Sequence, residues 1–319
     1  MSMSQVSENP FRYSDTNKRY HTYDYYLRRT YGEKCAKITL DAGFTCPNID
    51  GHRGVGGCIY CSGGSRSRGC DALAPLKEQY EYQKASMLKK WSVKKFIPYL
   101  QAYTNSYTSP ENFERIIKEV SALDRAVMID IATRADCLED EKINILHKIS
   151  AEIPVTVELG LQSSDDKTAE LINRCHTYAE FTDCFERLRK GAPNVKIAVH
   201  IINGLPGEKR EQMIKTLKDV GGLHPDIIKI HLLHIIEGTP LAGMYERGEY
   251  TPMERDEYIS TVCDQLELLP SDIVVERVTG DGLKESLIAP LWSLRKTEVI
   301  NGIDKELYRR GTYQGFYLK

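Results

Sequence analysis

The feature of the sequence that most constrains its fold is a group of three cysteines, Cys46, Cys58 and Cys61, within sixteen residues. Cys58 and Cys61 form a Cys-x-x-Cys pair, a spacing that directs two thiolates toward one metal. Four glycines lie between positions 51 and 57, so the backbone can wrap closely around a bound group and direct its N–H groups inward. Sulfur ligands surrounded by backbone amides indicate an iron–sulfur cluster, whose potential depends on hydrogen bonds to sulfur.

The number of cysteines distinguishes a zinc site from an iron–sulfur site. A structural zinc site has four ligands that close its coordination shell, and this run offers three. A [4Fe–4S] cluster held by three cysteines leaves one iron open for another ligand. Two alternatives remain open: a zinc knuckle that borrows Cys35 or Cys70, and reduced thiols that bind no metal.

The composition excludes several other classes of protein. No apolar run reaches ~18 residues, so we expect no membrane span, and the first ten residues have no apolar signal-peptide core. The nine cysteines are an odd number and mostly scattered, which indicates a reducing compartment and predicts a cytoplasmic protein. The net charge of −2 argues against indiscriminate nucleic-acid binding but permits a local basic patch.

Apolar stretches alternate with helical patterns along most of the chain. The predicted strands span 37–40, 96–103, 127–132, 155–161, 196–202 and 227–233, with a further strand at 273–278. Helical patterns cover 139–150, 179–190, 208–222 and 250–269. This alternation predicts βα units and a parallel sheet, with too few units to close an eight-stranded barrel. Chemistry is then expected at the carboxyl ends of the strands.

The cysteine loop resembles that of the radical S-adenosylmethionine (radical SAM) enzymes, in which the open iron binds the amino and carboxylate groups of SAM. The run Gly-Phe-Thr-Cys-Pro-Asn at 43–48 is similar to the loop of the Elongator-type subgroup. The resemblance implies a [4Fe–4S] cluster on Cys46, Cys58 and Cys61, and SAM as the second cofactor. It also implies an α/β fold with a partial (β/α)6 TIM-like barrel. We expect this barrel at 36–240, an N-terminal extension at 1–35, and a C-terminal extension covering the barrel at 241–319.

The resemblance implies functional roles for particular residues at the ends of the strands. Residues expected to contact SAM follow successive strands: Tyr103, Thr104, Asn105, Arg134, Gln162, Arg174 and Gly204. Gln162 and Arg174 correspond to groups that hold the ribose and carboxylate of SAM. A polar turn is the alternative for 104–105, and a rim pair with Asp136 is the alternative for Arg134. We expect Glu158, His200 and His231 to act on the substrate as catalytic residues, with core positions as the alternative for the histidines.

The N-terminal extension is crowded with arginine, lysine and tyrosine. Such residues bind phosphates and stack on bases. The candidate phosphate contacts are Lys18, Arg19, Arg28 and Arg29, with Arg309 and Arg310 near the other end of the chain. The alternative is an extension that packs its tyrosines on the barrel with its charges outward.

Features of the tail, including Ala-Pro-Leu-Trp at 289–292 and Thr-Tyr-Gln-Gly at 312–315, are similar to the YhcC/YtqA-like (MnmL) family. This resemblance implies modification of the tRNA wobble uridine. The reaction converts 5-carboxymethylaminomethyluridine to 5-aminomethyluridine through a 5′-deoxyadenosyl radical. It also implies a partner methyltransferase and an electron donor such as flavodoxin or ferredoxin. The alternatives are a radical SAM enzyme of a small metabolite and a non-catalytic metal-binding module.

Overall fold

The computed structural model describes residues 9–62, 71–280, 282 and 284–318. Its core is a sheet of seven strands in the described part of the chain, ordered β1-β2-β3-β4-β5-β6-β8, with every neighbouring pair parallel. The sheet curls into a half-barrel, and this confirms the predicted α/β partial barrel. The strands are β1 (Cys35–Leu40), β2 (Lys95–Leu100), β3 (Ile129–Thr133), β4 (Val155–Gln162), β5 (Lys196–Asn203), β6 (Ile227–Leu232) and β8 (Val274–Arg277).

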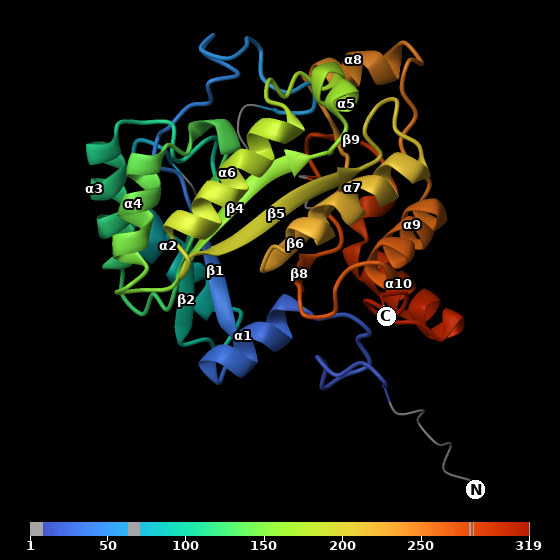
Figure 1. Ribbon diagram of the computed structural model, residues 1–319, viewed down its shortest axis with the longest axis horizontal. Coiled ribbons are helices and arrows are strands. Elements are labelled where there is room, and N and C mark those ends of the chain that lie inside the picture. Colours follow the sequence, from blue (N-terminus) through green and yellow to red (C-terminus); the bar gives the residue numbers. More distant parts are fainter. Residues whose placement is uncertain (1–8, 63–70, 281, 283, 319) are drawn as a thin grey trace, which may run out of the picture.

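Helices cover the outer face of the sheet (Figure 1). They are α2 (Leu76–Leu88), α3 (Pro110–Ser121), α4 (Asp140–Ile149), α6 (Tyr178–Gly191), α7 (Arg210–Leu223), α9 (Arg255–Glu267) and α10 (Lys296–Arg310). Helix α3 shows why these segments are helical. Ser109 caps its first turn by accepting from the amide of Asn112, Pro110 occupies the first position, and the apolar residues of one face are buried. Burial of that face against the sheet supplies most of the stability of such a helix.

The carboxyl ends of the strands and the cysteine loop lie at one end of the half-barrel, together with the short helices α5 (Asp166–Leu171) and α8 (Pro240–Glu246) (Figure 1). A two-stranded antiparallel pair, β7 (Ile235–Ile236) with β9 (Leu287–Ala289), also follows the barrel strands. We call this the open end, because inward-facing residues there, such as Gln162, His200 and His231, are partly exposed.

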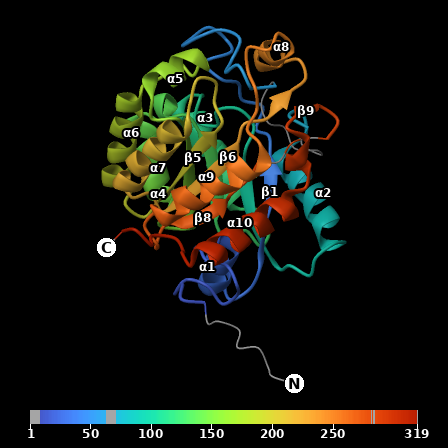
Figure 2. The ribbon, with the colours of Figure 1, turned by 90° about the vertical axis from the view of Figure 1, so that its right-hand side faces the viewer.

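Helix α1 (Tyr23–Tyr31) lies across the opposite end of the half-barrel, which we call the closed end (Figures 1 and 2). Leu27 packs with Cys35 of β1, Ile97 of β2 and Met128, which directly precedes β3. Tyr23 and Tyr26 extend this contact toward residues of β5, β6 and β8. The N-terminal extension therefore buries aromatic side chains against the barrel, as one of the two alternatives predicted.

The two extensions also contact each other. The amide of His21 donates to Gln314 Oε1 at 2.8 Å, and the amide of Gln314 donates to the carbonyl of Arg19 at 2.9 Å. Gln314 is fully buried and also donates to two carbonyls before β8. Among the described residues, the helices are too short or too polar to cross a membrane. The boundaries at residues 35 and 240 stay predictions.

Candidate active site

The cysteine loop is folded around tight turns at the open end. The amide of Ile49 donates to the carbonyl of Cys46 at 2.8 Å, and the amide of Cys61 donates to that of Cys58 at 2.9 Å. Gly56 and Gly57 have φ values of 79° and 75°, which residues with a Cβ rarely adopt. Cys46, Cys58 and Cys61 are each partly exposed residues, and the charges of Cys46 and Cys61 both raise the pKa of Cys58.

These features fit an iron–sulfur cluster. Burial raises the pKa of Cys58 to about 11, while the nearby guanidinium of Arg134 opposes that rise and favours the thiolate that a metal requires. The side-chain nitrogen of Asn48 lies 3.7 Å from Cys58 Sγ, and Asn48 Oδ1 is buried without a hydrogen-bond partner among the described residues. Cys46, Cys58 and Cys61 would hold the cluster, and donors such as Asn48 would surround its sulfurs.

The segment after α5 holds the cysteine loop in place. Asn173 has a φ of 54° and donates from its side chain to the carbonyls of Val55 and Gly57 at 3.0 and 2.7 Å. Asn48 donates to the carbonyl of Asn173, and the amide of Ile59 donates to that of Ile172 at 3.1 Å. These contacts fix the cysteine loop relative to the segment after α5, which the sequence pattern did not predict.

The other cysteines differ in their distance from this loop. Cys35 lies at the start of β1 under α1, at the closed end, so the structure does not support its use as a ligand. Cys70 lies outside the described residues. Cys175 was missed, because it follows α5, far along the chain from the cysteine loop. A Cβ on Gly54 would lie 2.7 Å from Cys175 Sγ, which places this fourth thiol directly against the loop.

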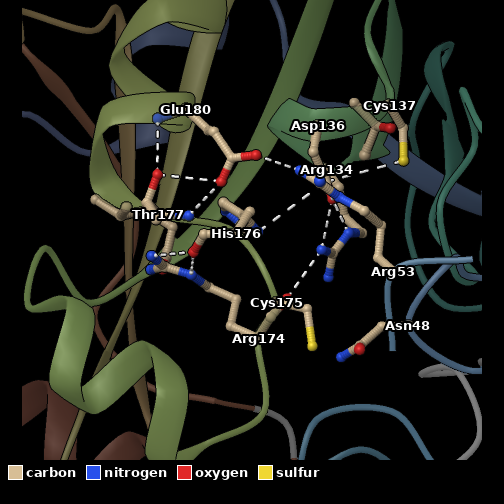
Figure 3. Close-up of polar contacts among 12 residues, drawn as sticks. Asn48, Arg53, Arg134, Asp136, Cys137, Arg174, Cys175, His176, Thr177 and Glu180 are labelled. Carbon is tan, nitrogen blue, oxygen red and sulfur yellow. Dashed lines mark hydrogen bonds and ion pairs between the residues drawn. The ribbon is translucent and has the colours of Figure 1, made fainter. Parts of the chain in front are cut away.

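Arg134 belongs to a group of ion pairs at the rim (Figure 3). Its Nε and Nη2 donate to the two carboxylate oxygens of Asp136 at 2.9 and 2.8 Å, and Nη2 also donates to the carbonyl of Arg174 at 2.9 Å. Arg53 of the cysteine loop donates to Asp136 at 3.0 Å and pairs with Glu180. The rim-pair alternative therefore describes Arg134, and a contact with SAM stays a prediction.

Arg174 is 1% exposed, and its guanidinium donates hydrogen bonds to backbone carbonyl oxygens. Nε and Nη2 donate to the carbonyl of His176 at 3.0 and 2.8 Å, and Nη1 donates to those of Ser163, at 2.5 Å, and Leu161. In this conformation Arg174 organises the turn after β4, so its contact with the SAM carboxylate remains a prediction that the observed contacts do not favour. Gln162 is partly exposed, with a φ of 68°.

The segment after β2 combines an exposed and a buried part. Tyr103 is partly exposed with a φ of 59°, whereas Asn105 is fully buried. Asn105 donates to the carbonyls of Leu100, Ala102 and Ala132, which matches the polar-turn alternative. The amide of Thr104 donates to the carbonyl of Thr45 at 3.2 Å and links this turn to the cysteine loop.

Gly204 follows β5 with a φ of 85°, and its carbonyl accepts from the hydroxyl of Tyr250 at 2.6 Å. A Cβ at Gly204 would lie 3.1 Å from a carbon of Met253, so the close approach of the C-terminal segment requires glycine. The predicted SAM contacts of Tyr103, Thr104, Asn105, Gln162 and Gly204 stay predictions.

One polar side chain from each of the seven strands meets inside the half-barrel. We call this layer the polar ring: Lys37, Tyr99, Asp130, Glu158, His200, Lys229 and Glu276. Lys37 Nζ lies 2.5 Å from Asp130, 3.1 Å from Glu158 and 2.6 Å from Glu276. Lys229 pairs with Glu158 and lies 2.9 Å from Glu276. Because Lys37 and Glu276 belong to the two edge strands, their pair bridges the seam of the half-barrel.

Charge in the polar ring is closely balanced. Three carboxylates lie within 4.8 Å of one another, and the two ammonium groups neutralise most of their charge. Burial by itself would raise the pKa of Glu158, but Lys229 and Lys37 hold it well below its usual value. Asp130 differs, because burial outweighs the attraction of Lys37 and raises its pKa to about 6. The sequence signal for the ring was a single charged residue within each of several apolar strands.

Two of the predicted catalytic residues, His200 of the polar ring and His231, lie next to each other. His200 Nε2 lies 3.2 Å from Glu158, without hydrogen-bond geometry, and the His200 ring stacks on His231 with centroids 5.0 Å apart. Burial, reinforced by Lys229, lowers the pKa of His200, and burial lowers that of His231 well below the usual value. Both imidazoles are therefore neutral at pH 7. Glu158 is 1% exposed and also accepts from Tyr99 at 2.6 Å, so it organises the ring rather than facing the open end.

The predicted N-terminal phosphate contacts are mostly paired with carboxylates or buried, so the structure does not favour this prediction. Lys18 pairs with Asp304, Arg19 is 7% exposed, and Arg28 binds both carboxylate oxygens of Asp15 at 2.7 and 3.0 Å. At the other end of the chain, Arg309 pairs with Glu306, and Arg310 pairs with Glu306, Asp264 and Glu267. Of these six residues only Arg29 makes no ion pair with a described residue and is exposed.

Comparisons with known proteins agree with this architecture. Residues 49–220 match the model of the Radical SAM superfamily, and residues 225–309 match that of the Radical_SAM C-terminal domain. The chain belongs to the radical SAM superfamily, whose members use a [4Fe–4S] cluster and SAM, and this confirms the predicted cofactors. It is 44% identical to the uncharacterized protein YtqA of Bacillus subtilis (strain 168), over 98% of this chain and 97% of that protein. The predicted YhcC/YtqA-like relationship is therefore confirmed.

Two further proteins are similar to this chain. A tRNA uridine(34) acetyltransferase of Methanocaldococcus jannaschii is 30% identical over 49% of this chain and 29% of that enzyme. The structure of the archaeal Methanocaldococcus infernus Elp3 superposes with a TM-score of 0.66 and 19% identity, over 88% of this chain and 64% of that one. The latter similarity supports the fold. The family match overturns the alternative of a non-catalytic metal-binding module.

Proposed function

We propose that this radical SAM enzyme modifies the wobble uridine of tRNA, converting 5-carboxymethylaminomethyluridine to 5-aminomethyluridine. The observation that carries the assignment to the wobble uridine is the similarity of about half the chain to an enzyme named for uridine 34 of tRNA, and the particular reaction is the one that the resemblance to the YhcC/YtqA-like (MnmL) family implies. When bound, the cluster and SAM supply a 5′-deoxyadenosyl radical, which requires a target held within a few ångströms. The carboxymethyl methylene gives up one hydrogen atom and then one electron, which returns to the redox cofactor, and water hydrolyses the resulting imine to the amine of 5-aminomethyluridine and glyoxylate. The bond broken is therefore that between the amine nitrogen and the carboxymethyl carbon.

The residues of the half-barrel suit this task. The cysteine loop would hold the cluster at the open end, and the side chain of Asn173 clamps this loop to the segment after α5. Below it, His200 and His231 offer neutral imidazoles that hydrogen-bond to a substituted uracil without repelling the positive charge of its amine. The polar ring and α1 close the half-barrel at its closed end and exclude water from that side, which protects a reactive radical. We further propose a cytoplasmic enzyme, an electron donor of the flavodoxin or ferredoxin class, and a partner methyltransferase in the same pathway.

The test is nucleoside analysis of tRNA after reaction with the reduced protein and SAM. We expect loss of 5-carboxymethylaminomethyluridine and gain of 5-aminomethyluridine, with one 5′-deoxyadenosine per conversion. The matched control is the same tRNA with an unmodified wobble uridine, which should yield no base product. Cleavage of SAM without any change in the modified tRNA would contradict the proposal.

A second candidate is a radical SAM enzyme that acts on a small metabolite. The observation that favours it is the engagement of Lys18, Arg28 and Arg310 in internal ion pairs, which leaves fewer unpaired charges among the predicted phosphate contacts. A metabolite enzyme would bind tRNA weakly and would cleave SAM at the same rate with and without tRNA. Tight tRNA binding that depends on salt would favour the first function instead.

A further inference from the structure

A second group of basic residues lies on the surface, outside the segments that the sequence analysis singled out. The turn between α2 and β2 reads Lys-Lys-Trp-Ser-Val-Lys-Lys at 89–95 and contains four lysines and no acidic residue. Lys89, Lys90 and Lys94 are exposed, as is Lys34, which follows α1. We call Lys34, Lys89, Lys90, Trp91 and Lys94 the lysine turn.

Trp91 is the aromatic centre of the lysine turn. Its side chain is 49% exposed, although burial of an indole is normally favourable, and Lys34 Nζ lies 4.5 Å above its ring. The backbone around it is ordered by hydrogen bonds. The amides of Lys90 and Trp91 both donate to the carbonyl of Met87 at 2.9 Å, and Val93 is buried beneath the turn. An ordered, exposed indole beside lysines is typical of surfaces that stack on nucleic-acid bases.

The charges of the lysine turn are not neutralised by neighbours. Lys34, Lys89, Lys90 and Lys94 make no ion pair with another residue in the described part of the chain. Lys95, beside them, contacts Glu33 at 3.7 Å and donates to the carbonyl of Tyr31 at 2.7 Å. This contrasts with the N-terminal and C-terminal arginines, most of which pair with carboxylates. Unpaired ammonium groups around an aromatic ring complement the phosphates of RNA.

The lysine turn lies far from the open end of the half-barrel. Helix α2 packs on β1 and has its carboxyl end at the turn, near the closed end of the barrel (Figure 2). The helix has 13 residues, so it separates the turn from the open end by about 20 Å. Tyr82 and Leu88 on the same helix are 68% and 42% exposed. A folded RNA whose reactive base enters the open end is large enough to follow α2 to the turn.

We propose that the lysine turn binds the phosphate backbone of tRNA, with Trp91 stacking on a base or packing on a sugar. This inference rests on the proposed function. It assigns RNA affinity to the α2–β2 turn and not to the N-terminal extension. It also separates binding from chemistry, since the turn contacts neither the cysteine loop nor the polar ring.

The experiment compares three variants under anaerobic conditions. The first is Lys89→Gln, Lys90→Gln and Lys94→Gln together, and the second is Trp91→Ala. The matched control is Lys148→Gln, Lys218→Gln and Lys305→Gln, which removes the same charge from exposed positions on α4, α7 and α10. For each protein we would measure tRNA affinity against salt, iron content, and SAM cleavage without tRNA. The last two should match the wild type in every variant, which shows that folding is intact.

We expect the lysine variant to lower the slope of log affinity against log salt by about 2 to 3, at 0.7–0.9 per phosphate contact. The control should change the slope by less than about 0.5. Trp91→Ala should weaken tRNA binding about 5- to 100-fold and leave the slope unchanged, because stacking carries no charge.

The outcomes distinguish this inference from the function on which it rests. If the wild type binds and modifies tRNA while the lysine variant keeps the wild-type slope, the surface is wrong and the function stands. If the wild type neither binds nor modifies tRNA, the proposed function fails and this assignment fails with it. Binding of the wild type, but not the lysine variant, to anionic vesicles in place of tRNA would assign the turn to a membrane surface and overturn the RNA inference.

Discussion

The two ends of the half-barrel are built in different ways. At the open end, loops after successive strands hold glycines, cysteines and partly exposed polar residues, and the backbone adopts positive φ at Tyr103, Gln162, Asn173 and Cys175. At the closed end, the tyrosines of α1 cover the strand starts, and side chains such as Leu27 and Ile97 are buried. The polar ring lies between them. The comparison shows that stability and chemistry are divided along the barrel axis, as parallel α/β folds permit.

The largest expected effect tests whether the cysteines of the two ends differ. Cys46→Ala, Cys58→Ala and Cys61→Ala should each remove a cluster ligand and abolish SAM cleavage. Cys35→Ala, at the closed end, is the matched control and should keep both the cluster and the activity, because Cys35 packs under α1. Iron and sulfide analysis with a 5′-deoxyadenosine assay makes the measurement. Loss of the cluster in the Cys35 variant would contradict the assignment of cluster binding to the open end alone.

The second prediction concerns the polar ring. Glu158→Gln removes the negative charge that Lys37, Lys229 and Tyr99 share, and leaves two buried ammonium groups undercompensated. Breaking a buried ion pair in this way typically costs about 3–5 kcal/mol of unfolding free energy. Urea denaturation at pH 7.5 would measure the loss. The double variant Glu158→Gln with Lys229→Met should recover part of it, and an equal or larger loss in the double variant would contradict the pairing.

The third prediction concerns the clamp on the cysteine loop. Asn173→Gly keeps the positive φ but removes two hydrogen bonds to the loop, which should loosen it by about 1–3 kcal/mol. We expect faster cluster loss on exposure to a chelator, with little change in global stability. His224→Gly is the matched control, because His224 also has a positive φ, of 53°, but lies at the carboxyl end of α7, away from the loop. Equal rates of cluster loss in both variants would show that the hydrogen bonds of Asn173 do not stabilise the cysteine loop.

The smallest effect is a pH dependence. Burial raises the pKa of Asp130 to about 6, from 3.8, so its contribution to stability is complete below about pH 4 and is lost as the pH rises through 6. Asp130→Asn stays neutral throughout. Relative to this variant, we expect the wild type to lose about 1–3 kcal/mol of unfolding free energy between pH 4 and pH 7. Denaturation curves across this range test it, and parallel pH profiles would show that Lys37 compensates the charge of Asp130 completely.

Local sequence patterns predicted the strands of the half-barrel better than the side-chain contacts at its open end. The strands were found within a few residues, because apolar runs between helical patterns leave few other arrangements. The cysteine loop was found because three ligands lie close together in sequence. The clamp by Asn173, the thiol of Cys175 and the contacts of Arg174 with Leu161 and Ser163 were not found, since each depends on contacts between segments more than ten residues apart.

The N-terminal extension also shows that sequence alone does not specify the tertiary contacts of a segment. Its arginines and tyrosines are equally consistent with an RNA surface and a packed cap, because composition does not specify which carboxylates or apolar faces lie nearby. Folding brings Asp304 to Lys18 and Asp15 to Arg28, and it places Tyr23 over the barrel. The lysine turn was overlooked for the opposite reason, because its lysines stand out only once most of the arginines of the extension and tail are seen to be paired.

By itself the sequence determined that this protein folds as parallel βα units and carries a three-cysteine loop, since both depend on short-range periodicity and spacing. The tertiary structure decided which charged side chains are buried together. Lys37, Asp130, Glu158, Lys229 and Glu276 come from five strands spread over 240 residues and meet in one layer. Desolvation makes such charges costly alone and favourable only in combination, so their positions have meaning only after the half-barrel has formed.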